Sequence, residues 1–351
     1  MSAAAGPALP ETTARVPLDP VSSSPWQLEE VACDWCGARD ADVLLHGRDR
    51  AHGLPGEFAV VRCTRCDLAR TSPRPGLDSL ASAYPASYPE HQSASRPPRP
   101  PEGLRRWALV CRRGYPLGRS VPGALRCLVQ PLAAFVLAGR RSHGYLPYEG
   151  QGRLLDFGCG TGRYVGRMAA AGWRAEGIDA DAEAVRRGRD AGLTLHVGTL
   201  PGADLPAGAF DAVTMWQALE HVPSPKATLA AAVRLLRPGG RLVIVCPRLD
   251  SLPARWFGTY WFALELPRHL WHFTAATLRR HVEGAGLTVR RVRPVRRPAI
   301  LRRSFAHLAD ETGRPLHRFL ARSRLVPGAM SWIARMAGRS GQMMLEAQRV
   351  H

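Results

Sequence analysis

The stretch Arg153-Leu-Leu-Asp-Phe-Gly-Cys-Gly-Thr-Gly-Arg163 constrains the fold of this chain more than any other segment. Its first five residues form a short apolar run that is typical of a buried parallel strand. Three glycines follow at alternate positions, Gly158, Gly160 and Gly162, and a helical pattern begins directly after them. Glycines permit a tight turn and let a ligand approach bare backbone, while a helix N-terminus offers unpaired N–H groups. The stretch therefore predicts a strand–loop–helix unit that binds a ligand.

Strand and helix patterns alternate from residue 151 onward, which indicates a doubly wound α/β domain. An arginine-rich helical insertion is expected at 299–339, and the segment 341–350 is expected to be the closing strand. Upstream of this domain, residues 1–28 have the Pro, Ser and Ala content of a disordered tail. We expect a small cysteine-containing module at 29–75. A Pro- and Ser-rich linker with a helical segment should span 76–150, and the α/β domain 151–351. The helical segment has a one-sided apolar stripe, which we expect to pack on the α/β domain unless the helix lies at a membrane interface: Leu125, Leu128, Val129, Leu132, Phe135 and Val136.

Two C-x-x-C pairs, Cys33 with Cys36 and Cys63 with Cys66, are separated by about 26 residues. This spacing matches a four-thiolate zinc ribbon, because two thiolates on one tight knuckle can both face a tetrahedral ion. A redox role is the alternative, but neither pair opens a helix of a βαβ unit. Four cysteines leave no open position for water, so we expect the Zn²⁺ to be structural.

The formal net charge of +19 comes almost wholly from arginine, since Lys226 is the only lysine. Such a charge favours anionic partners, such as nucleic acid, a membrane surface or a phosphorylated substrate, although a basic protein without such a partner fits it equally well. Residues 1–25 lack the apolar core of a secretory signal. We therefore expect a cytoplasmic protein. Peripheral contact with an anionic membrane through 299–339 stays open, as do dimerisation or pocket cover by this insertion.

Two carboxylates narrow the identity of the ligand. Asp179 ends the second predicted strand, where an acid can accept hydrogen bonds from both hydroxyls of an unphosphorylated ribose. A dinucleotide and S-adenosylmethionine both meet this condition. Asp156 lies just before the first glycine, where it would repel a pyrophosphate but attract the cationic amino-acid part of S-adenosylmethionine.

Residues 151–295 resemble the class I S-adenosylmethionine-dependent methyltransferases. The matching segments are LLDFGCGTG, EGIDAD, FDAVTMWQALEHVPSP, LRPGGRLVIVCP and PRHLWHFTAATLRRHVEGAGLTV. The resemblance implies a Rossmann-like seven-stranded sheet whose last strand is antiparallel. It also implies that the methionine part lies among Asp156 and the three glycines, and the ribose at Asp179. The residues that the resemblance places near the adenine or the other edge of the cofactor are Thr199, Leu200, Trp216 and Gln217.

The resemblance implies methyl transfer, which requires the nucleophile to be held in line with the methyl group and water to be excluded. A hydroxyl acceptor benefits from a base with a pKa near neutrality, which makes His221, His269 and His272 the candidates. Each could instead serve packing alone. We expect O- or C-methylation of a small molecule, such as a sugar, a lipid-linked compound or a secondary metabolite. An RNA methyltransferase that grips its substrate through the zinc ribbon and basic surface is the second hypothesis, although no N-P-P-Y/F-type motif follows the fourth strand. A non-catalytic cofactor-binding scaffold is the third. The oligomeric state stays open.

Overall fold

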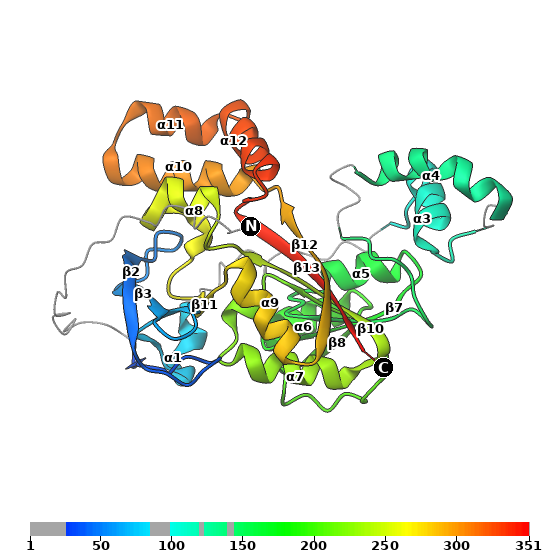
Figure 1. Ribbon diagram of the computed structural model, residues 1–351, viewed down its shortest axis with the longest axis horizontal. Coiled ribbons are helices and arrows are strands. Elements are labelled where there is room, and N and C mark those ends of the chain that lie inside the picture. Colours follow the sequence, from blue (N-terminus) through cyan, green and yellow to red (C-terminus); the bar gives the residue numbers. More distant parts are fainter. Residues whose placement is uncertain (1–25, 85–98, 119–122, 139–143, 351) are drawn as a thin grey trace, which may run out of the picture.

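The computed structural model describes residues 26–84, 99–118, 123–138 and 144–350. At its centre lies a seven-stranded sheet in the order β12–β13–β10–β9–β6–β7–β8 (Figure 1). The strands are β6 (Arg153–Phe157), β7 (Arg174–Asp179), β8 (Thr194–Val197), β9 (Phe210–Trp216), β10 (Leu236–Pro247), β12 (Leu287–Val295) and β13 (Gln342–Arg349). β13 pairs antiparallel with both β10 and β12, and the other pairings recorded within the sheet are parallel. This confirms the predicted Rossmann-like sheet and its antiparallel last strand.

Helices cover both faces of the sheet. Successive side chains of a strand point to opposite faces, so each strand contributes to two cores. In β10, Leu242 and Ile244 join the core beneath α7 (Pro225–Leu235) and α9 (Ala275–Gly284). Val243 between them joins the second core, beneath α5 (Arg163–Ala169) and α6 (Ala182–Asp190). Because both faces of these strands are buried, consecutive side chains are apolar, which explains the continuous apolar runs in the sequence.

The N-terminal module is built into the larger domain. The sheet of this module contains β2 (Ala41–Arg48), β3 (Glu57–Cys63) and β4 (Ala69–Thr71). It is extended by β11 (Trp271–His272), which comes from the α/β domain, between β10 and α9. The short strand β1 (Leu28–Glu29) pairs with β5 (Arg74–Pro75). A helix α1 (Leu77–Leu80) and a 3₁₀ turn η1 (Ala81–Ala83) follow, within the segment that its prolines and serines led us to expect as a linker. Residues 85–98 of that segment lie outside the described residues.

Two helical units stand on the same side of the molecule, beyond the carboxyl edge of the parallel strands (Figure 1). One is the pair α3 (Gly103–Arg113) and α4 (Gly123–Ala138). The other contains α8 (Leu252–Phe257), the 3₁₀ turns η4 (Gly258–Tyr260) and η5 (Phe262–Leu264), α10 (Pro298–Thr312), α11 (Pro315–Arg322) and α12 (Leu325–Met336). Within the described ranges, no helix combines the length and apolarity needed to cross a bilayer.

The apolar stripe expected in α4 packs only in part. Val129 and Val136 are half-buried against the second core, but Leu132 and Phe135 are exposed, the latter by 80%. The buried positions are Ala133 and Leu137. A periodic pattern places side chains on one helix face but does not say which face packs, and here the face with the smaller residue Ala133 lies against the protein.

Candidate active site

The glycine loop lies at the carboxyl end of β6, next to the end of β7. Gly158, Gly160 and Gly162 all have left-handed φ angles, of 71°, 52° and 79°, a region that side chains disfavour. A Cβ on Gly158 would stand 2.6 Å from the Cβ of Ala218, so this position also requires glycine for space. The loop can therefore present bare backbone to a ligand.

The carboxylate of Asp179 holds this loop in place. One oxygen accepts the Gly160 N–H at 2.7 Å and the other accepts the Asp181 N–H at 2.9 Å. An ionised carboxylate offers about four acceptor positions, so positions remain for the hydroxyls of a ribose. The sequence placed Asp179 at the end of the second strand, and the structure brings it to the loop.

Asp156 is a buried acid beneath the loop. Its side chain is 2% exposed and accepts one hydrogen bond, from Thr214 Oγ1 at 2.6 Å. Burial raises the pKa of this carboxyl to about 7. The surrounding residues therefore do not stabilise the carboxylate form of Asp156. A cationic ligand group placed beside it would stabilise that form by electrostatic attraction.

The remaining residues predicted to line the cofactor lie at the carboxyl ends of β8 and β9, on either side of β6 and β7. Thr199 and Leu200 follow β8, and Leu200 is buried. The Trp216 ring at the end of β9 lies 4.9 Å from the ring of Tyr164. Gln217 is strained, with a φ of 55°, and its side-chain N–H₂ donates to Glu220 Oε1 at 3.2 Å. Its amide therefore braces the next turn.

That turn, η3 (Leu219–His221), contributes to a cluster formed with His269. Each residue of the cluster offers one atom that could bind a metal ion, and these three atoms lie within 4.8 Å of one another: Glu220, His221 and His269. His221 Nδ1 lies 3.1 Å from the carbonyl oxygen of Arg268, an acceptor only, so Nδ1 carries the proton. The lone pair of His221 is then at Nε2. Two imidazoles and a carboxylate are also a set that divalent metal ions accept.

Burial sets the protonation of this cluster. It raises the pKa of Glu220 to about 8, and Glu220 Oε2 has no hydrogen-bond partner among the described residues. Burial also lowers the pKa of His221 and that of His269. At neutral pH the cluster therefore holds neutral imidazoles beside a largely protonated carboxyl, an arrangement able to accept and pass on a proton.

His272 has a different position. It lies in β11, and its Nε2 is 3.0 Å from Thr71 Oγ1. Because that hydroxyl donates to the carbonyl oxygen of His269 at 2.7 Å, the Nε2 of His272 must be the donor to Thr71. Burial lowers the pKa of His272 to about 3. The geometry gives His272 a bracing contact.

The N-terminal module, through Thr71, and the segment that follows it, through Tyr84, form one wall of the cluster, which the sequence did not reveal. The hydroxyl of Tyr84 lies 2.9 Å from His221 Nδ1. Arg268 and Asp49, both side chains fully buried, form a two-pronged ion pair at 2.8 and 2.9 Å. Asp49 and Arg268 are 219 positions apart, so no local motif could have indicated the pair.

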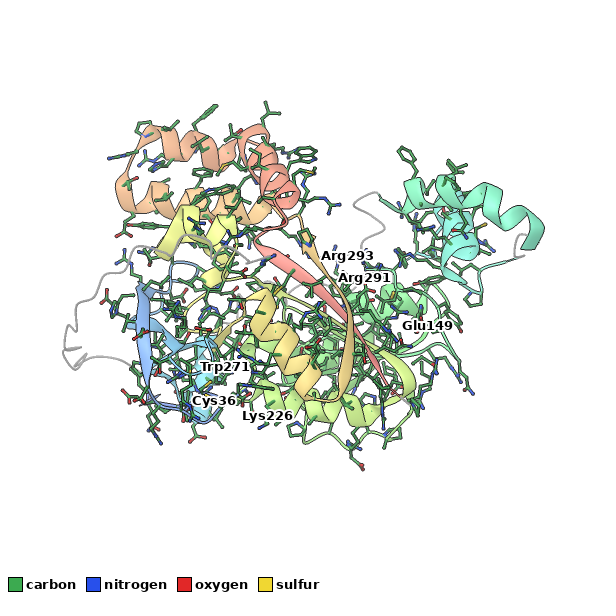
Figure 2. The ribbon with its side chains drawn as sticks, in the orientation of Figure 1. Cys36, Glu149, Lys226, Trp271, Arg291 and Arg293 are labelled. Carbon is green, nitrogen blue, oxygen red and sulfur yellow. The ribbon has the colours of Figure 1, made fainter. Side chains whose placement is uncertain are left out.

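The four paired cysteines meet. The sulfur atoms of Cys33 and Cys66 are 3.3 Å apart, those of Cys36 and Cys63 are 3.5 Å apart, and all four lie within 4.8 Å of one another. Tetrahedral thiolates bound at ~2.3 Å stand about 3.8 Å from one another, so the cluster fits a zinc ion. Asp34 in the first knuckle accepts the backbone N–H of Lys226 at 2.7 Å, which holds the module against α7; Figure 2 labels Cys36 and Lys226.

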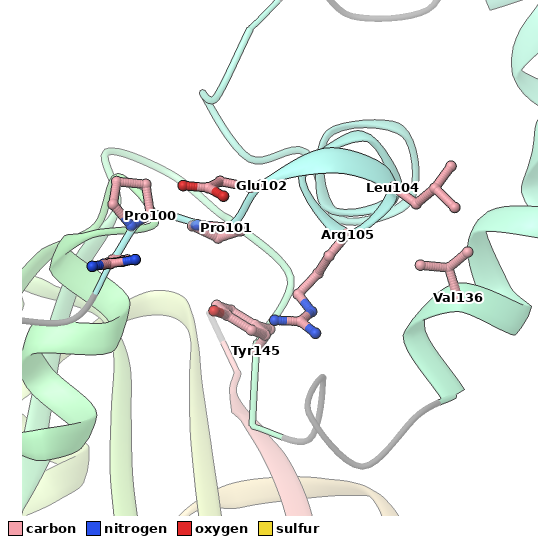
Figure 3. Close-up of a pocket in the computed structure, with 8 residues that line it drawn as sticks. Pro100, Pro101, Glu102, Leu104, Arg105, Val136 and Tyr145 are labelled. Atoms are coloured by element: carbon pink, nitrogen blue, oxygen red, sulfur yellow. The ribbon is translucent and has the colours of Figure 1, made fainter.

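A cavity of about 410 Å³ opens between the start of α3, α4 and the loop at Tyr145 (Figure 3). Its lining combines charged and apolar side chains: Arg99, Pro100, Pro101, Glu102, Leu104, Arg105, Val136 and Tyr145. Tyr145 follows Gly144, whose carbonyl oxygen accepts the hydroxyl of Tyr164, the ring that contacts Trp216. One hydrogen bond and one ring contact therefore link the chain at Tyr145 to Trp216 at the edge of the predicted cofactor site.

Comparison with known proteins matches residues 126–292 to a family described as "Methyltransferase domain". A "Ubiquinone biosynthesis O-methyltransferase" from Xanthomonas oryzae pv. oryzae is 39% identical over 132 residues, covering 34% of this chain and 54% of the relative. A protein of the same name from Aromatoleum aromaticum is 41% identical over 97 residues, covering 26% of this chain and 42% of the relative. The chain spans about half the length of the curated relatives it matches.

Among solved structures, a S-adenosylmethionine dependent methyltransferase from Mesorhizobium loti gives a TM-score of 0.41 at 21% identity, covering 58% of this chain and 94% of that one. A complex between the Haloferax volcanii Trm112 methyltransferase activator and a putative methyltransferase gives a TM-score of 0.44 at 17% identity, covering 72% and 99%.

Proposed function

We propose that this chain, whose residues 126–292 match a methyltransferase domain, transfers the methyl group of S-adenosylmethionine to a small-molecule acceptor. The observation that carries the proposal is Asp156. A dinucleotide would bring a pyrophosphate toward this acid, whereas S-adenosylmethionine brings an ammonium and a sulfonium. A buried carboxyl with a pKa of about 7 gains most from a cationic ligand.

We assign each part of this donor to a different set of residues. The loop 158–162 and Asp156 would hold the amino-acid part, and Asp179 would accept the ribose hydroxyls through positions that Gly160 and Asp181 leave unused. Thr199 and Leu200 would border the adenine, with Trp216 at the other edge. When bound, the donor supplies a methyl group on an excellent leaving group, so the protein's task is alignment and exclusion of water.

For a hydroxyl acceptor, His221 is the residue that we assign as general base. Its Nδ1–H is held by the carbonyl of Arg268, which leaves Nε2 to accept the proton. Burial lowers the pKa of His221, so the imidazole is neutral and ready at physiological pH. The positive charge that His221 then acquires would be balanced if the neighbouring Glu220 carboxyl released its own proton. His272 donates to Thr71 through Nε2, so it could act as a base in this scheme only if that hydrogen bond broke.

The acceptor class that we favour is a sugar, lipid-linked compound or secondary metabolite, methylated at oxygen or carbon. The name of the matched relatives, ubiquinone biosynthesis O-methyltransferase, supports O-methylation of a small molecule. We propose a cytoplasmic location and a structural zinc ion at Cys33, Cys36, Cys63 and Cys66. RNA as the acceptor draws support from the net charge of +19 alone, and a non-catalytic scaffold would leave the proton-accepting cluster without a use.

Calorimetric titration tests the donor. The protein should bind S-adenosylmethionine in preference to NAD⁺, and Asp179→Ala should weaken that binding at least tenfold, because the ribose contacts and the brace on Gly160 are both lost. The matched control is Asp190→Ala, which removes an exposed acid of α6 and should leave the affinity unchanged. Equal affinity of the wild type and Asp179→Ala would overturn the assignment.

A further inference from the structure

The outer face of α12 is apolar although it faces solvent. Leu325, Trp332, Ile333 and Met336 are exposed by 84, 52, 55 and 65%. Their spacing of three, four and seven to eight residues places them on one side of the helix. The opposite side packs inward through Pro327, Ser331 and Ala334. The packing of α12 against the protein therefore does not bury these four apolar side chains.

The neighbouring helix α11 extends this surface and adds charge. Leu316 and Phe319 are exposed by 62 and 64%. Residues 313–341 contain no aspartate or glutamate. Within the described part of the chain, four guanidinium groups of this segment form no ion pair: Arg314, Arg318, Arg322 and Arg324. We call the six exposed apolar side chains and these four arginines the α11–α12 surface.

The inward side of α12 is linked to the candidate active site. Ser331 and Ala334 line one small cavity together with Gln342, whose side chain donates to Gln217, which in turn donates to Glu220. The second helical unit, α3–α4, stands on the same side of the molecule (Figure 1) and exposes Leu132 and Phe135. Both units with exposed large apolar side chains thus flank the edge of the sheet where the acceptor would enter.

We propose that the α11–α12 surface docks on an anionic lipid bilayer and that the acceptor is carried in that bilayer. Docking at a bilayer surface is strengthened by buried apolar area and by attraction to anionic lipids, and this surface offers both. A second copy of the chain would set the same unpaired arginines against one another, which is unfavourable. Nucleic acid would satisfy the arginines but would not bury Leu325, Ile333 and Met336.

The docking itself does not depend on methyl transfer, but the acceptor class rests on the proposed function. Vesicle binding is therefore measured without donor. If donor binding failed while vesicle binding held, the proposed function would fall and the docking surface would stand; the reverse result would remove only the docking surface.

The experiment is co-sedimentation with vesicles of phosphatidylcholine containing about one-third phosphatidylserine, compared with vesicles of phosphatidylcholine alone. The wild type should bind the anionic vesicles. Arg318→Gln/Arg322→Gln should weaken this binding roughly 25-fold, since each arginine near an anionic surface contributes about fivefold. Trp332→Gln/Ile333→Gln should weaken it as well, through loss of apolar insertion. Both pairs are exposed, so circular dichroism should show folded variants.

The matched control is Arg186→Gln/Arg187→Gln, which removes two exposed arginines from α6 and should leave vesicle binding within twofold of the wild type. No binding of the wild type to anionic vesicles would overturn the proposal, as would an equal loss in the control. Sedimentation velocity adds a further test: a dimer that Trp332→Gln/Ile333→Gln dissociates, with vesicle binding unchanged, would assign the surface to a second copy instead.

Discussion

Replacing Asp156 by asparagine should make the folded protein more stable and the donor site weaker. The carboxyl has an ordinary pKa of 3.8 and a folded-state pKa of about 7, so the folded state keeps its proton to a higher pH than the unfolded chain does. Ionisation then opposes folding as the pH rises from about 4 to about 7, by ~1.4 kcal/mol per pH unit. Asparagine is neutral throughout and can still accept from Thr214.

We therefore expect Asp156→Asn to raise the free energy of unfolding by roughly 2–4 kcal/mol at pH 8, with the gain fading toward pH 4. Urea unfolding at a series of pH values measures it. The same substitution should weaken S-adenosylmethionine binding more than tenfold in calorimetry, because the ligand's positive charge loses its partner. A substitution that raises the free energy of unfolding but weakens ligand binding indicates that the acid serves to bind a cationic ligand and does not stabilise the fold.

Asp211 provides the matched control on the same sheet. It is also 2% exposed, but it pairs with Arg237 and accepts the backbone N–H groups of Gln151 and Arg153 at 3.1 and 2.9 Å. Asp211→Asn should therefore destabilise the fold, by about 3 kcal/mol, and leave the donor affinity unchanged. If Asp156→Asn instead lowered the stability, or left the affinity within twofold of the wild type, the electrostatic argument for the donor would be refuted.

Two further predictions concern the acceptor side. His221→Gln should lower kcat by about 10²–10³-fold with unchanged donor affinity; because burial lowers the pKa of His221 below its ordinary 6.5, wild-type kcat should stay level as the pH falls through that value. A fall of kcat centred at or above pH 6.5, or a variant as fast as the wild type, would remove His221 as the base. Purified protein should carry one zinc ion per chain by elemental analysis, and Cys63→Ser/Cys66→Ser should lose it together with methyl transfer, since the module forms a wall of the His221 cluster. A metal-free protein with full activity would contradict the structural zinc.

Most of the sheet and the donor side of the site could be predicted locally. The run Arg153–Phe157 and the glycines after it indicate a buried strand and a tight loop within eleven consecutive residues. Asp179 follows from the same logic, because the carboxyl ends of neighbouring parallel strands meet at one edge. The two cysteine knuckles are likewise local, and their meeting in space needed only the pairing of short strands.

The placement of helices against the rest could not be predicted in the same way. The stripe in α4 was expected to pack, yet Phe135 points to solvent, because periodicity defines a face without naming its partner. In 299–339 the sequence indicated basic helices and left membrane docking, dimerisation and pocket cover open. Only the tertiary structure shows which apolar residues remain exposed once α10 and α12 have packed.

By itself the sequence predicted the class of fold and the glycines and carboxylates around the loop, since both predictions depend on short local patterns. Only the tertiary structure shows which residues form the wall of the His221 cluster. It brings Tyr84 to His221 across 137 positions and Asp49 to Arg268 across 219. Such contacts arise from the docking of whole segments, in which burial of Arg268 is tolerated only because Asp49 is buried with it. No periodicity or spacing in the chain encodes that pairing.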